Sequence, residues 1–227
     1  MKKIFYIALF ILSISACSEK KRIDPNPVEN LVFGKVDTVS LLYVKAIQKF
    51  GKVEEGWFQY AKTFIYNNRG LVSEENLFLQ YTQLRAKFIY KYDDDDKLIS
   101  CDVYNGQGEL ESKITYTYDL VSNIVYQIQK SVINNFIMSN YTGYLNENGK
   151  LTEVIFYDNN GAELSRKKYR YDELGNQIES SIEFNNSVNI SSSQYSDIDK
   201  RGNWLKQIIY ENNEPEIMVI RSINYKD

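Results

Sequence analysis

Apolar and polar residues alternate along most of the chain. From Leu84 to Tyr92 every second residue is apolar or aromatic, whereas Arg85 and Lys87 lie between them. Ile114, Tyr116 and Tyr118 repeat this alternation with lysine and threonine at the intervening positions. A period of two places alternate side chains on opposite faces of a β-strand. The pattern therefore predicts antiparallel strands with one buried and one wet face.

Short segments rich in Asn, Asp and Gly separate these strands. They recur about every 13 residues, which fits one strand of seven to nine residues plus a turn. Tyrosines open many of the turns, and Tyr92, Tyr104 and Tyr118 recur 52 or 53 residues later as Tyr144, Tyr157 and Tyr171. Such regular repetition predicts one all-β domain over residues 31–227, an antiparallel meander of about 12–14 short strands. We expect the sheet to be curved or partly closed, because an apolar face needs cover.

The turn sequences resemble the YD, or RHS, repeat family, in which Tyr-Asp-x-x-Gly-Asn precedes an aliphatic residue. Tyr171-Asp172-Glu173-Leu174-Gly175-Asn176 is the best match. The resemblance implies tandem hairpin repeats and leaves the activity open. The residues that carry it are Tyr92, Asp93, Tyr118, Asp119, Tyr157, Asp158, Gly161, Tyr171, Asp172, Gly175, Asn176, Gly202 and Asn203.

The first residues have the order of a secretory signal. Lys2 and Lys3 precede the apolar run Ile4 to Ile14, which is too short to span a bilayer. The residues Ile14-Ser15-Ala16-Cys17 resemble the lipobox of bacterial lipoproteins. This resemblance implies a signal peptide over residues 1–16, lipid on Cys17 and, from Ser18, an outer-membrane location with the leaflet left open. Residues 17–30 hold two of the three prolines and are predicted to be the lipidated cysteine and a flexible tether.

Composition removes several classes of function. The chain has no histidine, which excludes Ser-His-Asp catalysis, imidazole ligation of zinc and the usual pH switch. Removal of Lys2 and Lys3 from the 27 basic residues leaves 25, so the mature net charge is 25 − 30 = −5. This balance argues against a nucleic-acid partner. Cys101 has Asp102 beside it and is predicted to be an inert strand residue.

Two kinds of side chain could bind a ligand. The run Asp93 to Asp96 could hold calcium, but its spacing better fits a solvated acidic turn, so we expect no metal. Exposed Trp57, Trp204 and Tyr171 could stack on a sugar, although tyrosine and aspartate are also what the turns need. We expect no cofactor.

Three functions remain open. The first is a non-enzymatic, lipid-anchored module that binds or scaffolds an envelope protein. The second is a glycan-binding accessory lipoprotein. The third is a hydrolase with a pair of carboxylates that the sequence does not mark out.

Overall fold

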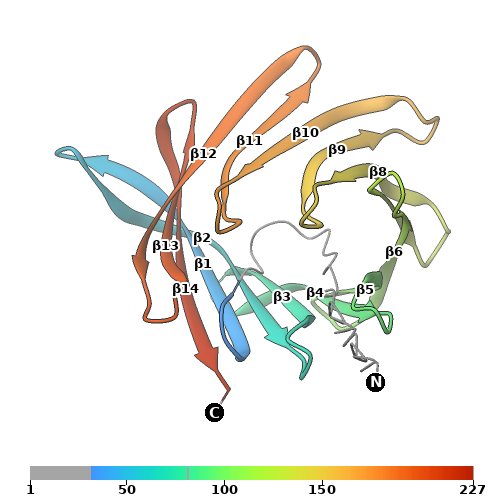
Figure 1. Ribbon diagram of the computed structural model, residues 1–227, viewed down its shortest axis with the longest axis horizontal. Coiled ribbons are helices and arrows are strands. Elements are labelled where there is room, and N and C mark those ends of the chain that lie inside the picture. The colour runs from blue at the N-terminus through green and yellow to red at the C-terminus, as the bar shows by residue number, and fades with distance from the viewer. Residues whose placement is uncertain (1–31, 81, 227) are drawn as a thin grey trace, which may run out of the picture.

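The computed structural model describes residues 32–80 and 82–226. The predicted signal peptide, Cys17 and the tether lie outside the described residues. Within that part of the chain, no helix is long and apolar enough to cross a membrane. Fourteen strands form the fold (Figure 1): β1 Val36–Lys49, β2 Lys52–Tyr66, β3 Val72–Gln80, β4 Gln83–Tyr92, β5 Leu98–Asn105, β6 Leu110–Asp119, β7 Ile124–Ser131, β8 Ile137–Leu145, β9 Leu151–Tyr157, β10 Glu163–Tyr171, β11 Gln177–Phe184, β12 Ser187–Ile198, β13 Trp204–Glu211 and β14 Glu214–Tyr225.

The strands form a closed antiparallel barrel. Each strand pairs with its neighbours in sequence, and β1 also pairs with β14 from Val36 to Lys45. In Figure 1 the blue β1 and the red β14 lie side by side. The predicted all-β antiparallel meander is therefore confirmed, but the expected partly closed sheet is wrong. Pairing of the first strand with the last leaves no free edge, which removes the need for a covering layer.

The hydrophobic core has two large clusters on the inner face of the barrel and a smaller one of Val44, Ala46 and Met218. Residues that are directly opposed on paired strands share a face, so the register separates inside from outside. One cluster lies around the β1–β14 pairing and includes Val39, Phe64 and Val219. The other runs from β5 to β9 and includes Leu98 and Val125. Tyr90 of β4 packs against both clusters.

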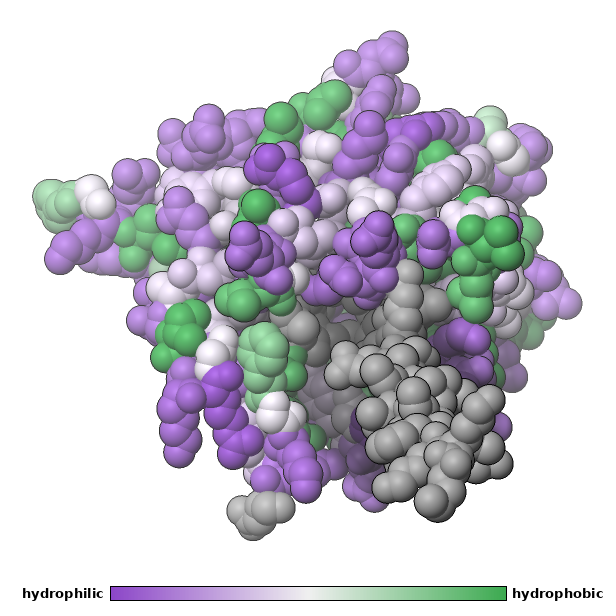
Figure 2. Space-filling view, viewed as in Figure 1, coloured by the Kyte–Doolittle hydropathy of each residue, from purple (hydrophilic) through white to green (hydrophobic). Residues whose placement is uncertain are grey.

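The outer face carries ion pairs between neighbouring strands. Examples are Lys91–Asp102 at 2.7 Å, Lys87–Glu74 at 3.2 Å, Arg170–Glu179 at 3.2 Å and Arg166–Glu153. Such surface pairs contribute little stability individually, but they mark the wall as solvated. Accordingly, most of the surface in Figure 2 is hydrophilic, with separate hydrophobic patches.

The two ends of the barrel differ. The near end carries residues 32 and 226 and the turns that follow β2, β4, β6, β8, β10 and β12. The far end carries the turns that follow the odd-numbered strands from β1 to β13. The described chain therefore enters and leaves the barrel at its near end.

The near-end turns contain most of the tyrosine-aspartate motifs. The Asp172 carboxylate accepts hydrogen bonds from the Asn176 N–H at 2.7 Å and from its side-chain amide, and Gly175 takes the required positive φ of 84°. Asp93 and Asp119 cap their turns in the same way, as does Asp158 with Gly161 at the far end. The carboxylates of these aspartates accept hydrogen bonds from backbone N–H groups of the turns.

The tyrosines close the open ends of the hairpins. The hydroxyls of Tyr92, Tyr118 and Tyr171 donate to carbonyl oxygens twenty residues earlier, at 2.9, 2.7 and 2.7 Å. Each acceptor lies at the start of the preceding strand, so each bond ties the two strands of one hairpin together. Far-end Tyr157 ends β9 before Asp158.

A buried asparagine joins the chain ends at the β1–β14 closure. Asn203, which follows Gly202 and is 2% exposed, accepts a hydrogen bond from the Phe33 N–H at 2.7 Å. Its side-chain amide donates to the Phe33 carbonyl at 3.0 Å and to the Tyr225 hydroxyl at 2.7 Å. The Tyr225 hydroxyl in turn donates to Asp199. Burial would raise the pKa of Asp199, but the bonds from Tyr225 and from backbone N–H groups outweigh it and hold the pKa at about 2.

Candidate protein-docking surface

Exposed large apolar side chains concentrate between residues 120 and 144. We call this set the β7–β8 patch: Leu120, Val121, Tyr126, Ile128, Val132, Ile133, Phe136, Met138 and Tyr144. None of the ion pairs named above lies on β7 or β8. The patch runs from the turn before β7 to the turn after it, which is the full height of the barrel. On β8 the polar residues Thr142 and Asn140, which oppose Tyr126 and Ile128, interrupt the apolar surface. Apolar side chains that gather on one side of a wall mark interaction sites.

The β7–β8 patch arises from strands that are apolar on the outside. The inward residues of β7 include fully buried Val125 and buried Gln127, while Tyr126 and Ile128 point outward. On β8, Tyr144 lies opposite Ile124 of β7, so the outward side chains of the two strands adjoin. A hydrophobic patch is visible in Figure 2 on the side of the barrel where β8 lies in Figure 1. Aromatic, aliphatic and Met side chains match the composition of interface centres, and Glu153 of β9, which lies opposite Tyr144, marks one edge of the patch.

Two lysines border the part of the β7–β8 patch that is closest to the far end of the barrel. Lys113 of β6 and Lys130 of β7 lie directly opposite each other on the outer wall, and both are exposed. No ion pair of either lysine is found among the described residues. Like charges at opposed positions disfavour the sheet. The pair therefore presents a positive rim to any partner that covers the patch.

The three aromatic residues that were predicted to face a ligand occupy different environments. Trp57 of β2 is 63% exposed. Trp204 is 4% exposed, and its ring lies 4.3 Å from the Arg221 guanidinium and 5.3 Å from the Tyr195 ring. Tyr171 uses its hydroxyl within its hairpin and has the Lys150 ammonium over its ring at 5.1 Å. Trp204 is thus a core residue, and of the two tryptophans Trp57 alone faces solvent.

A depression of about 440 Å³ lies at the near end between the turns after β8 and β10. Residues of both charges and several amides line it: Asn146, Asn148, Lys150, Thr152, Tyr169, Arg170, Tyr171, Asp172, Glu173, Leu174 and Gly175. Hydrogen-bond donors and acceptors are mixed in its wall, which suits a neutral, hydroxyl-rich molecule better than an ion.

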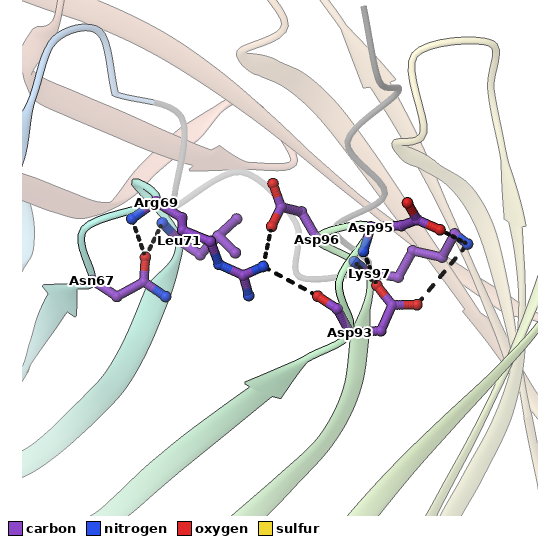
Figure 3. Close-up of polar contacts among 7 residues, drawn as sticks. All are labelled: Asn67, Arg69, Leu71, Asp93, Asp95, Asp96 and Lys97. Atoms are coloured by element: carbon purple, nitrogen blue, oxygen red, sulfur yellow. Dashed lines mark hydrogen bonds and ion pairs between the residues drawn. The ribbon is translucent and has the colours of Figure 1, made fainter.

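The acidic run Asp93 to Asp96 is engaged by neighbouring cations (Figure 3). Asp93 accepts hydrogen bonds from the N–H groups of Asp95 and Lys97, both at 2.9 Å. Arg69, in the adjacent near-end turn, pairs with Asp96 at 2.7 Å and donates to the Asp93 carbonyl. Among residues 32–80 and 82–226, no group of three or more acidic or cysteine side chains is arranged to hold a metal ion.

Cys101 lies fully buried on the inner face of β5, opposite Tyr90 and Ile114. Burial, with a smaller effect of Glu75 and Asp102, raises the pKa of the thiol to about 12. The thiolate is the reactive form, so the folded protein holds this cysteine inert.

We therefore expect Cys101 in a soluble Cys17→Ser variant to resist iodoacetamide at pH 8. Labelling should become complete only after unfolding in denaturant, as measured by intact mass. A Thr115→Cys variant on the exposed face of β6 provides the reactive control. Labelling of Cys101 at the rate of the control thiol would contradict its buried, protonated state.

No family model and no curated protein matches the sequence. Among solved structures, the chain is similar to a porin-like protein from Bacteroides uniformis ATCC 8492, with TM-score 0.48, 11% identity, and coverage of 85% of this chain and 98% of that chain. A porin-like protein from Bacteroides vulgatus ATCC 8482 gives TM-score 0.41, 13% identity, and coverage of 84% and 99%. A DUF1329 family protein from Desulfovibrio piger ATCC 29098 gives TM-score 0.31, 14% identity, and coverage of 84% and 86%.

The predicted membership of the YD repeat family is wrong. No family model supports it, and the similar structures include porin-like and DUF1329 proteins. The regular spacing of the tyrosine and aspartate turns follows from the geometry of single hairpins instead. Near-end turns begin at Asn67, Asp93, Asp119, Asn146, Asp172 and Asp199, which are 26 or 27 residues apart. One barrel hairpin with an Asx-capped turn and a closing tyrosine produces that spacing without a shared family.

Proposed function

We propose that this chain is a non-enzymatic binding module of the bacterial cell envelope, anchored by lipid on Cys17 to the outer membrane, and that its β7–β8 patch binds an envelope protein. The main support for this proposal is the patch itself, because it is apolar whereas other parts of the outer wall bear ion pairs between strands. The described chain enters the barrel at its near end, which supports contact of a partner with the side wall and the far end.

The side chains of the patch indicate what kind of surface the partner presents. The centre, formed by Tyr126, Ile128 and Met138, calls for an apolar complementary face. At the far-end rim, Lys113 and Lys130 call for carboxylates on the partner. The proposed partner is thus a folded protein with an apolar face that is bordered by acidic groups.

The test is crosslinking in the native bacterium, followed by affinity capture of the full-length protein. Ile128→Asp places a charge in the centre of the patch and should abolish capture of the specific partner. Ile99→Asp is the matched control, because Ile99 of β5 is 43% exposed and Ile128 is 37% exposed. A Lys113→Glu and Lys130→Glu double variant should weaken capture and make the residual complex less sensitive to salt. Equal capture by the wild type, Ile128→Asp and Ile99→Asp would overturn the proposal.

The second candidate function, glycan binding, is favoured by the near-end depression. Its mixed donors and acceptors, with Tyr171 below Lys150, suit a neutral saccharide. Calorimetric titration with cellobiose and chitobiose separates the two functions. Binding that is lost in Asn148→Ala and kept in Ile128→Asp would assign the depression to a sugar, whereas no heat with either disaccharide would count against this candidate.

A further inference from the structure

The turn between β1 and β2 carries an aromatic residue that the turn itself does not need. Lys49 and Lys52 pair across the hairpin, and the two residues between them are Phe50, with φ of 49°, and Gly51, with φ of 77°. Phe50 is fully exposed. Two-residue hairpin turns with positive φ at both central positions favour Asn and Gly, because a bulky side chain is strained there.

Other two-residue turns at the far end follow the expected chemistry. The turn after β11 is Asn185-Asn186, with φ of 49° and 61°, and the turn after β13 is Asn212-Asn213, with φ of 51° and 69°. The same backbone conformation therefore carries asparagine twice and phenylalanine once. Phenylalanine has no local preference for this backbone conformation, and the Phe50 side chain is not buried. Nothing within the fold therefore offsets the strain at this position. Strain that the fold does not explain points to a role outside the fold.

The hairpin that holds Phe50 is built as a projecting arm. With 14 residues in β1 and 15 in β2, these are the two longest of the described strands. The pairing shifts register between Tyr43 and Ala46. Gly56 permits the close approach there, since a Cβ atom on it would lie 2.8 Å from the Lys45 carbonyl oxygen. In Figure 1 the β1–β2 hairpin extends beyond the ring of strands, at the left.

We propose that Phe50 is a binding knob, which inserts into an apolar pocket of the partner protein while Lys49 and Lys52 meet carboxylates at the rim of that pocket. This inference rests on the proposed function and names a second contact with the same partner. The hairpin and the β7–β8 patch lie on opposite sides of the ring of strands, so the partner spans the far end, where the turns after β1 and β7 both lie. A buried aromatic anchor that is flanked by cations is typical of the residues that dominate protein interfaces.

Two observations favour a protein over a bilayer surface. The arm points to the far end, whereas the chain enters the barrel at the near end, so Phe50 faces away from the anchored side. The strands beside the tip of the arm also carry both signs of charge, because Lys49 pairs with Glu54 at 3.4 Å and Glu55 follows. Mixed charge suits a defined protein surface, whereas an anionic bilayer favours uniformly basic segments.

The first experiment places the photo-crosslinking amino acid p-benzoylphenylalanine at position 50 of the full-length protein in cells. The expected result is one recurrent protein adduct, which is identified by mass spectrometry and is absent when the crosslinker is at position 185 of the β11–β12 turn. The purified partner is then used to measure dissociation rates of three chains: wild type, Phe50→Asn and Phe50→Trp. We expect Phe50→Asn to dissociate at least tenfold faster and Phe50→Trp to stay within about threefold of the wild type.

A stability measurement separates binding from folding. Asparagine suits the positive φ of position 50, so Phe50→Asn should unfold at the same temperature as the wild type or a higher one. Loss of binding without loss of stability supports the knob. Unchanged dissociation of Phe50→Asn from the partner that the β7–β8 patch binds would overturn the knob and leave the proposed function standing.

Two other outcomes would also overturn the inference. If wild-type protein captures no specific partner, the proposed function fails and the knob fails with it. If the lipid-free chain floats with vesicles of phosphatidylethanolamine and phosphatidylglycerol, and Phe50→Asn abolishes flotation while no protein adduct forms, then Phe50 is a membrane contact instead.

Discussion

Replacing Trp204 with alanine is expected to lower the free energy of unfolding by about 3–5 kcal/mol, as measured by urea denaturation. The same change at Trp57 should cost less than about 0.5 kcal/mol. Trp204 is 4% exposed and packs in the core cluster around the β1–β14 pairing, against Arg221 and Tyr195. Trp57 is 63% exposed. Removal of the buried ring leaves a cavity that the closed barrel cannot collapse, whereas removal of the exposed ring leaves none.

Fluorescence provides the control for this comparison. With Trp204→Phe as the single-tryptophan chain, emission from Trp57 should be quenched readily by acrylamide. With Trp57→Phe, emission from Trp204 should be blue-shifted and resist quenching. Similar quenching of both chains would contradict the buried position of Trp204. The result also bears on glycan binding, because a saccharide in solution can stack on Trp57 but not on the buried ring.

The local parts of the fold could be predicted from the sequence. Alternation such as that of Leu84 to Tyr92 identifies strands, because it follows from the side-chain period of two. Turns such as Asp172 to Asn176 are visible because their dihedral angles demand particular residue types. Both signals depend on contacts within one hairpin.

The sequence could not predict that the barrel closes, nor whether certain side chains point inward or outward. Val36 pairs with Tyr225, and no local pattern reports a contact across that separation. Trp204 directly follows a turn and lies opposite the exposed Ile198, so its burial depends on contacts with Tyr195 and Arg221 that no local pattern reports. The unusual residue at position 50 could have been recognised in the sequence, because Phe-Gly stands where the other two-residue turns have Asn-Asn. Its strain becomes apparent only with the φ angles of the folded structure.

The β7–β8 patch was missed for a related reason. Ile124 to Ile128 reads Ile-Val-Tyr-Gln-Ile, which is apolar on one face and mixed on the other. Sequence alternation alone would bury the Ile124, Tyr126 and Ile128 face. The barrel register instead buries Val125 and Gln127, because these oppose Tyr118 and Tyr116 on the inner face of β6. A strand whose more apolar face points to solvent is a signal that can be recognised only once the register is known.

Asn203→Ala should lower the free energy of unfolding by about 3 kcal/mol, because it leaves the part-buried N–H and carbonyl of Phe33 without their side-chain partner and removes one of the hydrogen bonds of the Tyr225 hydroxyl. The Asn203 side chain bridges Phe33, ahead of the first strand, and Tyr225, at the end of the last. Its loss should therefore loosen the β1–β14 pairing before the rest of the barrel. Hydrogen exchange measures this directly, as faster exchange in β1 and β14 than in β5 to β8.

Asn176→Ala is the matched control for this prediction. Asn176 occupies the equivalent position in the preceding near-end turn, but its side-chain amide bonds only to Asp172 of that turn. The change should cost about 1 kcal/mol, the usual net contribution of one hydrogen bond. Equal losses in the two variants would show that Asn203 acts as an ordinary turn residue. A larger loss for Asn203→Ala, with faster exchange confined to the first and last strands, would show that this side chain reinforces the β1–β14 pairing where Phe33 and Tyr225 meet.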